Sequence, residues 1–337
     1  MKTSVVILNW NGRKLLEQFL PKVIKHSVDV NTEVIVADNG STDDSVEYLK
    51  TNFPFVRLII LDKNYGFAEG YNRALSQVDS EYVVLLNSDI ETTDNWLSIL
   101  IDYMDANPGV TAVQPKILDQ KKKTHFEYAG AAGGFIDRYG YPYCRGRVLG
   151  TVEKDNGQYD NAIPIFWATG ACLCIRREDY FEEGGLDGRF FAHMEEIDLC
   201  WRLNARGHVV ECVPQSIVYH VGGASLSAES PRKTYLNFRN NLLMLYKNLP
   251  QNRLIPVMAM RFMLDIAASL HFLVQGKTKN ASAVFGAFRD YLKMKPEFKE
   301  DRRNNIDRTI VHNPGTMYQG LIIWDYYVRG RRTFQNK

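Results

Sequence analysis

Short apolar runs alternate with amphipathic stretches over the first 118 residues of the chain. The apolar runs predict β-strands at Ser4–Leu8, Glu33–Ala37, Val56–Leu61, Tyr82–Leu86 and Val110–Pro115. The stretches between them have helical spacing, near Lys14–Lys25, Asp44–Thr51, Ala68–Gln77 and Asn95–Ala106. Because strands that alternate with helices are joined by right-handed crossovers, this order predicts a mostly parallel sheet with helices on both faces.

Polar residues follow these strands where the chain leaves the sheet. The buried-strand run Tyr82–Leu86, for example, leads directly into Asn87, Ser88 and Asp89. Since the carboxyl ends of parallel strands bind ligands, we expect the polar clusters to lie together at one edge of the sheet. A carboxylate such as Asp89 could ligate a divalent cation there, although an aspartate in this place also commonly caps a turn.

Two further clusters are candidates for contacts with a nucleotide. Asp38 lies in a strand-to-helix turn and could accept the imide N–H of a uracil or thymine base, or simply belong to a capped turn. The segment that contains Asn64, Gly66 and Asn72 brings small residues to a helix start, whose N–H groups favour phosphate. This segment lacks the P-loop and dinucleotide-binding fingerprints, which argues against sites of those two kinds.

The alternating pattern dissolves between residues 119 and 164, which we interpret as a long excursion with hairpins. Order returns at Ile165–Ile175, followed by a helix near Arg177–Glu183 and a short strand pair, Val209–Val213 and Ser216–His220. We therefore predict an α/β domain over residues 1–229, with a nucleotide-binding half at about 1–118 and an acceptor half at about 119–229. Residues 230–337 are predicted to form a helical C-terminal region.

Three acids, Glu195, Glu196 and Asp198, lie just before or at the start of an amphipathic helix. Acids in a first helical turn are favoured by the helix dipole, and Asp198 can pair with Arg202 one turn later. They also directly follow two phenylalanines, and apolar neighbours raise the pKa of a carboxyl group toward that of a general base. The lone His220 is either structural or, together with Asp89, a ligand that suits Mn²⁺ better than Ca²⁺.

Composition narrows the class of protein and its compartment. A net charge of +2 over 337 residues gives no indication of a nucleic-acid partner. An odd number of cysteines, five, and an N-terminal apolar run too short for a signal peptide favour the reducing cytoplasm. The apolar segment Leu254–Val274 is interrupted by Arg261, Asp265 and His271, which argues against a bilayer span.

Basic residues gather in the last third of the chain, where aromatic and apolar residues are also frequent. This composition suits a surface that faces anionic lipid, and we expect peripheral attachment to the inner face of the plasma membrane through the C-terminal helices. Formation of a homodimer through the same helices is the alternative.

Taken together, the clusters resemble family 2 glycosyltransferases, in particular the rhamnosyltransferase-like bacterial members, over roughly residues 3 to 247. The resemblance rests on motifs that occur in the family's order: Val5–Gly12, Asp38–Asp43, Asn64–Ala68, Leu85–Asp89, Thr169–Ala171 and Glu195–Arg202. Membership would imply a GT-A fold, with a Rossmann-like sheet, and inverting transfer of a sugar from a nucleoside diphosphate to a glycan or lipid-linked acceptor. It would also imply a divalent cation, Mn²⁺ or Mg²⁺.

The resemblance also implies roles for single residues. The donor would be dTDP- or UDP-linked, with rhamnose suggested by the subgroup. Asp38 would contact the nucleobase, Asn9 and Asn11 would line the nucleoside pocket, and Ser88 would lie near the ribose. Asp89 and His220 would hold the metal. Glu196 would be the general base and Glu195 would bind the acceptor.

Two positions depart from the family pattern. Asn87 replaces the first acid of the Asp-x-Asp motif, and Glu196 replaces an aspartate, which leaves the choice of base between Glu196 and Asp198 open. Two other functions remain alternatives: a nucleotidyltransferase that makes sugar nucleotides, and a non-catalytic partner that binds them. The first usually begins with a Gly-rich loop that bears Arg or Lys, and Ser4–Gly12 contains no such residue.

Overall fold

A computed structural model of the chain describes residues 1–29, 31–222 and 230–336. In this part of the chain, a central sheet contains β1 (Thr3–Asn9), β2 (Thr32–Asn39), β3 (Arg57–Leu61), β4 (Tyr82–Asn87), β5 (Ile90–Thr92), β6 (Val110–Asp119), β11 (Ile163–Pro164), β12 (Cys172–Arg176) and β13 (Val209–His220). The strand order is β11-β13-β6-β12-β4-β1-β2-β3, and β5 pairs with β13. The strands from β4 to β3 are parallel, as are β6 and β13, whereas β12 runs antiparallel to both of its neighbours.

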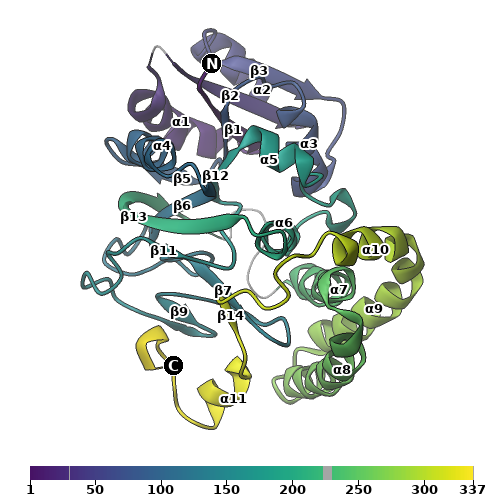
Figure 1. Ribbon diagram of the computed structural model, residues 1–337. Helices are drawn as coiled ribbons and strands as arrows, with labels where there is room; N and C mark the ends of the chain where they lie inside the picture. The colour runs from purple at the N-terminus through teal and green to yellow at the C-terminus, as the bar shows by residue number, and fades with distance from the viewer. Residues whose placement is uncertain (30, 223–229, 337) are drawn as a thin grey trace.

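Helices cover both faces of this sheet (Figure 1). They are α1 (Arg13–Ser27), α2 (Ser45–Asn52), α3 (Gly66–Leu75), α4 (Trp96–Ala106), α5 (Arg177–Glu182) and α6 (Glu195–Ala205), with a 3₁₀ turn η1 (Gly188–Phe190) before α6. The side chains of β4 alternate between two cores: Val83 and Leu85 pack with α3, whereas Val84 and Leu86 pack with α1 and α4. A strand buried on both faces has no polar side, which explains the continuous apolar run in the sequence.

The excursion predicted between residues 119 and 164 forms most of a second, smaller sheet. This sheet has the order β10-β9-β8-β7-β14, with β7 (Gly134–Asp137), β8 (Pro142–Cys144), β9 (Arg147–Val148), β10 (Thr151–Val152) and β14 (Met317–Tyr318). The predicted strand pair at Val209–Val213 and Ser216–His220 is wrong, because both halves belong to β13. An irregularity in register between Val213 and Ile217 marks the polar break that suggested a turn.

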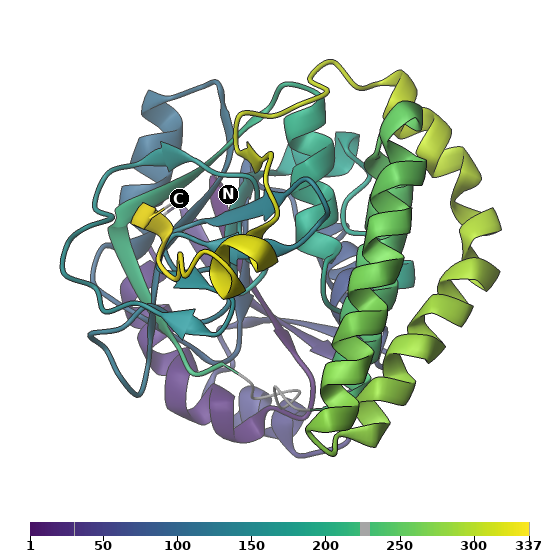
Figure 2. The same ribbon diagram turned by 90° about the horizontal axis from the view of Figure 1, so that it is seen from below.

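The C-terminal region is helical and lies beside α6 (Figure 1). It contains α7 (Pro231–Asn248), α8 (Gln251–Val274), α9 (Thr278–Met294), η2 (Lys295–Phe298), α10 (Lys299–Asp307), α11 (Ile322–Tyr327) and η3 (Phe334–Asn336). Figure 2 shows the green helix α8 along the outside of the molecule, with the yellow α11 on the same side. Leu242, Tyr291 and Ile322 belong to the same apolar core as α3 and α6. The region thus shares its core with the α/β domain.

Candidate active site

The polar clusters that end β1, β2 and β4 meet at one edge of the central sheet. Asn9 pairs in register with Asp38, and Leu8 pairs with Asn87 on the other side. The expectation that these clusters lie together is therefore confirmed. Residues far apart in the sequence come together here because the parallel strands place their carboxyl ends side by side.

Asn9, Asn11 and Asp38 tie the first two strand-end loops together. The Asn9 amide donates to Asp38 Oδ1 at 3.0 Å and to Ser41 Oγ at 3.2 Å, and the Ser41 backbone N–H donates to Asp38 Oδ2 at 2.9 Å. Asn11 has a left-handed backbone (φ 50°), and its Oδ1 accepts a bond of 2.7 Å from the Thr42 N–H. These contacts orient Asp38 rigidly, and its role toward a nucleobase stays a prediction.

The turn before α3 is built by Asn64 and Gly66. Asn64 Oδ1 accepts from the Gly66 N–H at 2.8 Å, and Gly66 has a positive φ of 80° with the Phe191 ring against it. The first free N–H groups of α3, those of Phe67 and Ala68, donate to the Phe191 carbonyl at 2.7 and 3.3 Å. This helix start therefore holds a loop of the protein, and contact of Asn64 and Gly66 with the donor stays a prediction.

Asn72, on the next turns of α3, is engaged inside the protein. Its Oδ1 accepts from Tyr180 Oη at 2.6 Å and from the Leu186 N–H at 3.1 Å, and its amide donates to the Leu186 carbonyl at 2.7 Å. Both ends of the side chain thus join α3 to the segment after α5. The structure gives Asn72 a packing role, and contact with the donor stays a prediction.

Asp89 and His220 come together after β4 and at the end of β13. His220 Nε2 lies 3.1 Å from Asp89 Oδ1, and both side chains are nearly buried. On the other side of the ring, His220 Nδ1 lies 3.5 Å from Glu127 Oε1. Burial lowers the pKa of His220, but hydrogen bonds to Asp89 and Glu127 outweigh this effect and raise its pKa to about 10.

Glu127 is a site residue that the sequence analysis missed. It lies within the irregular excursion, so neither periodicity nor a strand end drew attention to it. Its Oε2 accepts a hydrogen bond from the Ala129 N–H, which fixes the carboxylate beside His220.

Ser88 and Asn87, two predicted site residues, lie nearby. Ser88 Oγ lies beside Gly12 in the first loop, and the Asn87 N–H donates to the Ala171 carbonyl at 3.0 Å.

The donor atoms at this place fit a cation only in part. Asp89 supplies a carboxylate and His220 a ring nitrogen, and Mn²⁺ accepts both kinds of ligand. Over residues 1–29, 31–222 and 230–336, no group of three or more His, Cys, Asp or Glu side chains has the arrangement of a metal site. A cation held here would take most of its ligands from a bound diphosphate and from water.

Glu195 and Glu196 begin α6 directly after a strained loop. Phe191, His193 and Met194 all have positive φ angles, of 68°, 72° and 73°. Such backbone costs about 1–3 kcal/mol per residue and persists only where surrounding contacts enforce it, commonly at functional sites. One carboxylate oxygen of each glutamate, Oε2, is buried without a hydrogen-bond partner. Two acids, each with one carboxylate oxygen that lacks a partner, thus follow an enforced turn.

Burial perturbs both glutamates. Burial raises the pKa of Glu196 to about 7, against the partial opposition of backbone N–H donors that include Gly170. Burial and the neighbouring Glu196 charge raise the pKa of Glu195 well above its ordinary value. A carboxylate with a pKa near the working pH is suited to accept a proton from a substrate hydroxyl.

Asn240, on α7, holds the strained loop in place. Its amide nitrogen lies 2.9, 2.9 and 2.8 Å from the carbonyl oxygens of Phe190, Ala192 and His193. Arg239 donates to the side-chain oxygen of Asn240, Oδ1, and to the Phe190 backbone carbonyl, which orients the Asn240 amide. The C-terminal helices therefore contribute to the site, which no local sequence signal indicated.

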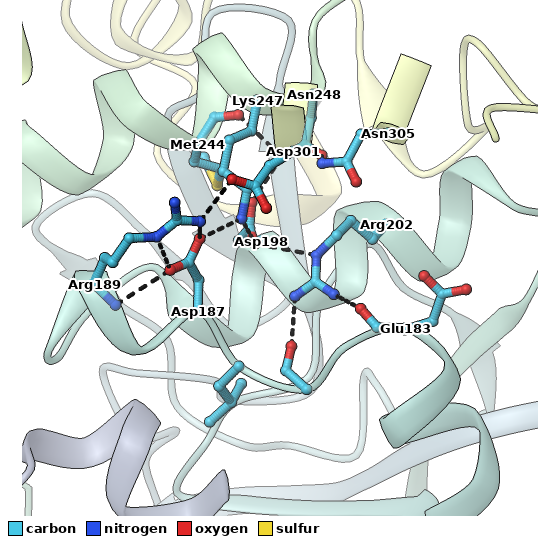
Figure 3. A network of polar contacts seen from close by, with 12 residues as sticks. Glu183, Asp187, Arg189, Asp198, Arg202, Met244, Lys247, Asn248, Asp301 and Asn305 are labelled. Carbon is cyan, nitrogen blue, oxygen red and sulfur yellow. Dashed lines mark hydrogen bonds and ion pairs between the residues drawn. The ribbon is translucent and has the colours of Figure 1, made fainter. Parts of the chain in front are cut away.

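Asp198, the other candidate base, lies in a different environment. It is fully buried and is held by Arg202 at 3.1 Å, Lys247 at 2.8 Å and Asn248 at 2.8 Å. Figure 3 shows this carboxylate at the centre of a network that joins α6 to α7 and reaches Asp187. Its oxygen atoms are directed toward structural partners on three sides.

Comparisons with known proteins agree with this geometry. Residues 4–168 match the family model described as glycosyl transferase family 2. An N-acetylglucosaminyl-diphospho-decaprenol L-rhamnosyltransferase of Mycobacterium tuberculosis is 26% identical over 230 residues, which cover 64% of this chain and 75% of that protein.

Solved structures share the fold. GalNAc-T7 with UDP, GalNAc and Mn²⁺ superposes with a TM-score of 0.59 at 17% identity, over 74% of this chain and 48% of that chain. TarS 1–349 of S. aureus in complex with UDP-GlcNAc superposes with a TM-score of 0.57 at 15% identity, over 91% and 89% of the two chains. The predicted α/β fold with a helical C-terminal extension is confirmed. With its GT-A fold, its matching family model and its rhamnosyltransferase relative, the chain carries a family 2 glycosyltransferase domain over residues 4–168 and is an enzyme of the hexosyltransferase type.

Proposed function

We propose that the enzyme transfers a hexose from a nucleoside diphosphate to a hydroxyl group of a lipid-linked saccharide, with inversion at the anomeric carbon. The observation that carries the proposal is the pair of glutamates at the start of α6, Glu195 and Glu196, each with one buried carboxylate oxygen that has no partner, on a different element from Asp89 and His220. Inverting transfer needs a base on the side of the sugar opposite to the leaving group, so two separate acidic centres are the minimum requirement.

The choice of substrates is guided by the relatives. The mycobacterial relative is named for L-rhamnosyl transfer to N-acetylglucosaminyl-diphospho-decaprenol, and TarS was solved with UDP-GlcNAc. We therefore propose a dTDP- or UDP-linked hexose as donor, with rhamnose the first sugar to test. Family membership favours this reaction over nucleotidyl transfer and over a non-catalytic binding role.

A divalent cation would be held by Asp89 and His220 against the donor diphosphate. When bound, it would stabilise the negative charge of the leaving nucleoside diphosphate. Glu127 would hold the imidazole from its far side, since a metal-binding histidine usually donates its second N–H to a carboxylate or carbonyl. Glu127 would therefore act indirectly, by orienting the His220 ring.

Glu196 would act as the base. Its carboxylate accepts the proton of the acceptor hydroxyl as the hydroxyl oxygen bonds to the anomeric carbon and the bond from that carbon to the diphosphate oxygen breaks. The products are the glycosylated acceptor and the free nucleoside diphosphate. Glu195 would bind the acceptor, and the pKa of Glu196 near 7 keeps a large fraction ionised at neutral pH.

The test of the base is transfer by the full chain from dTDP-rhamnose or UDP-hexoses to a short-chain N-acetylglucosaminyl-diphospho-lipid. Glu196→Gln should lower kcat by about 10²–10⁴-fold, the usual contribution of a general base. The matched control is Glu178→Gln, at an exposed acid in the first turn of α5, which should transfer at the wild-type rate. Full activity of Glu196→Gln, or a product that retains the anomeric configuration, would refute the assignment.

The cation is tested by thermal unfolding with dTDP, UDP or GDP, each with and without Mn²⁺. A ligand that binds only the folded state raises the melting temperature. We expect the nucleotide to raise it further when Mn²⁺ is present, and Asp89→Ala to lose this additional shift while keeping the fold. An Mn²⁺-dependent shift that survives Asp89→Ala would place the cation elsewhere.

A further inference from the structure

The helix α8 has its polarity reversed relative to an ordinary surface helix. Its buried positions include the polar residues Arg261, Asp265 and Ser269. Near its ends it exposes Gln251, Asn252 and His271, and its other exposed large side chains are apolar: Ile255, Phe262, Met263, Leu270, Leu273 and Val274. A helix at a protein surface normally buries the apolar stripe and exposes the polar one.

Specific contacts hold the buried polar side of α8 in place. Arg261 pairs with Asp265 at 3.0 Å, and its guanidinium lies 3.9 Å from the centre of the Tyr141 ring in the β7–β8 hairpin. The orientation of α8 is thus fixed by contacts on its inner side, and the apolar stripe is held outward. Contiguous exposed apolar surface of this kind marks an interaction site.

The composition of α8 suits hydrocarbon. Among the residues that the structure describes, it is the one helix with the length and composition of a bilayer span, with 24 residues and a mean hydropathy of 1.6 over its most apolar window. Only 22% of that window is buried inside the protein. A spanning orientation would detach the Arg261–Asp265 pair from Tyr141 and carry charged groups into the bilayer, which is costly. A helix that lies in the membrane plane keeps these contacts.

A second element on the same side of the molecule has the residues of a membrane interface. Figures 1 and 2 show α11 on the lower face that also carries α8. Trp324 and Tyr327 are exposed there, and Arg329 and Arg332 are exposed just after the helix. Tryptophan and tyrosine favour the level of the lipid headgroups, and arginine is attracted to anionic lipid.

The charges on this face favour lipid over a second copy of the chain. The acids of α8 and α11 are Asp265 and Asp325, and both are buried. Arg329 pairs with Asp325 at 3.1 Å, so the unbalanced charge after α11 is cationic and comes from Arg331 and Arg332. A symmetric dimer brings identical patches together and would oppose like charges, whereas an anionic bilayer complements them.

The end of α8 lies close to the active site. The first turn of α9, which follows α8 directly, is joined to the start of α7: the Asn280 amide donates to Thr234 Oγ1 at 2.8 Å. Two residues before Thr234, the Arg232 guanidinium lies 5.7 Å from the centre of the Phe191 ring, in the strained loop of the site. The exposed Leu273 and Val274 are thus on the site side of the helical region.

We propose that the face formed by α8 and α11 binds the surface of an anionic lipid bilayer, with α8 lying in the membrane plane and Arg332 on the headgroups. The proposal does not depend on which sugar is transferred, since it rests on the polarity of α8 and the residues of α11. It places the site next to the bilayer surface.

The test is flotation of the full chain with vesicles of phosphatidylcholine, alone or with phosphatidylglycerol. We expect wild-type protein to float with the anionic vesicles, and the double variant Phe262→Glu, Leu270→Glu to lose at least ten-fold in vesicle-bound fraction. Arg332→Glu, at an exposed arginine after α11, should reduce the preference for anionic vesicles. The matched control is Phe55→Glu, at an exposed phenylalanine between α2 and β3 at the other end of the molecule, which should float like wild type.

Melting temperatures near the wild-type value would show that all variants are folded, as their exposed positions predict. Wild-type protein that stays in the lipid-free fraction with anionic vesicles would overturn the proposal. Equal flotation of Phe262→Glu, Leu270→Glu and wild type would do the same. Dimers of wild type and monomers of that variant, measured by light scattering without vesicle binding, would assign the face to a second copy instead.

Discussion

Burial acts on Glu196 in two opposite ways. It raises the pKa from an ordinary value near 4.5 to about 7, which suits proton transfer, and it disfavours the ionised form of the folded protein. Between these two pH values the folded state binds more protons than the unfolded state. Stability therefore falls as the pH rises through this window, and the full cost of the buried charge is present above pH 7.

Glu196→Gln should consequently stabilise the fold at alkaline pH. Glutamine has nearly the same shape and no charge, so at pH 8 the variant should gain up to about 3 kcal/mol in unfolding free energy over wild type. The gain should shrink toward zero below about pH 4.5, where the wild-type carboxyl is protonated in both states. Denaturant unfolding at pH 4, 6 and 8 measures it, and a difference that is independent of pH would contradict the pKa shift.

The choice between the two candidate bases shows what the sequence could and could not provide at this scale. Glu196 and Asp198 lie two residues apart, and both follow the same apolar segment. The pairing of Asp198 with Arg202 one turn later could be read from the spacing, but its partners Lys247 and Asn248 arrive from α7. Those contacts join residues about 50 positions apart, and no periodicity or spacing reports them.

At the scale of elements, the loop 190–194 depends on α7 for its shape. Asn240 satisfies three carbonyl groups of a segment whose backbone is otherwise unfavourable.

Strands and helices of the first 118 residues were predictable because periodicity and turn residues define them locally. The course of β13 and the docking of α7 were not, since a bulge and a side-chain contact between distant segments leave no periodic signal.

Asn240→Ala should weaken transfer by relaxing this loop. We expect kcat to fall by roughly ten-fold to a hundred-fold. The acid limb of the kcat/KM profile should move from about pH 7 toward the ordinary pKa of glutamate, because Glu196 becomes more hydrated. The matched control is Asn241→Ala, its buried neighbour, whose amide donates to the Gly140 carbonyl at 2.6 Å and reaches the loop only through a long contact of 3.9 Å with the Met194 sulfur.

Both alanine variants should lose about 1–3 kcal/mol of stability, because each leaves buried carbonyl groups without a donor. Only Asn240→Ala should shift the pH profile. Equal shifts in the two variants would mean that the loop responds to general loosening of α7, and an unchanged profile in Asn240→Ala would remove its positioning role.

At the scale of the whole molecule, the C-terminal helices are part of the folded unit. Lys247 reaches from α7 to Asp187 at 2.7 Å and to Asp198 at 2.8 Å, and all three side chains are largely buried (Figure 3). Burial by itself would raise the pKa of Asp187, but Arg189 and Lys247 outweigh it and hold that pKa well below its usual value. A division of the chain at residue 229 therefore cuts through a charged network.

Lys247→Met should destabilise the whole molecule by about 3–5 kcal/mol at neutral pH, because it leaves two buried carboxylates short of a cation. Since the pKa of Asp187 is lowered by folding, the stabilisation it reflects is present above pH 4 and is lost as the pH falls through the native pKa. The loss in Lys247→Met should therefore shrink in acid. The control, Lys293→Met, removes an exposed lysine 4.0 Å from Asp290 and should cost under about 1 kcal/mol.

A double variant tests whether the loss of stability in Lys247→Met comes from the charged network and not from the changed volume of the side chain. Asp198→Asn removes one of the charges that Lys247 neutralises, so Lys247→Met should be less damaging in its presence, with a coupling of about 0.5–3 kcal/mol. Denaturant unfolding followed by tryptophan fluorescence and by circular dichroism should give one shared transition, because helical region and sheet share a core. Additive losses in the double variant would contradict the network. Two separate transitions would show that α7 to α10 fold independently of the glycosyltransferase domain.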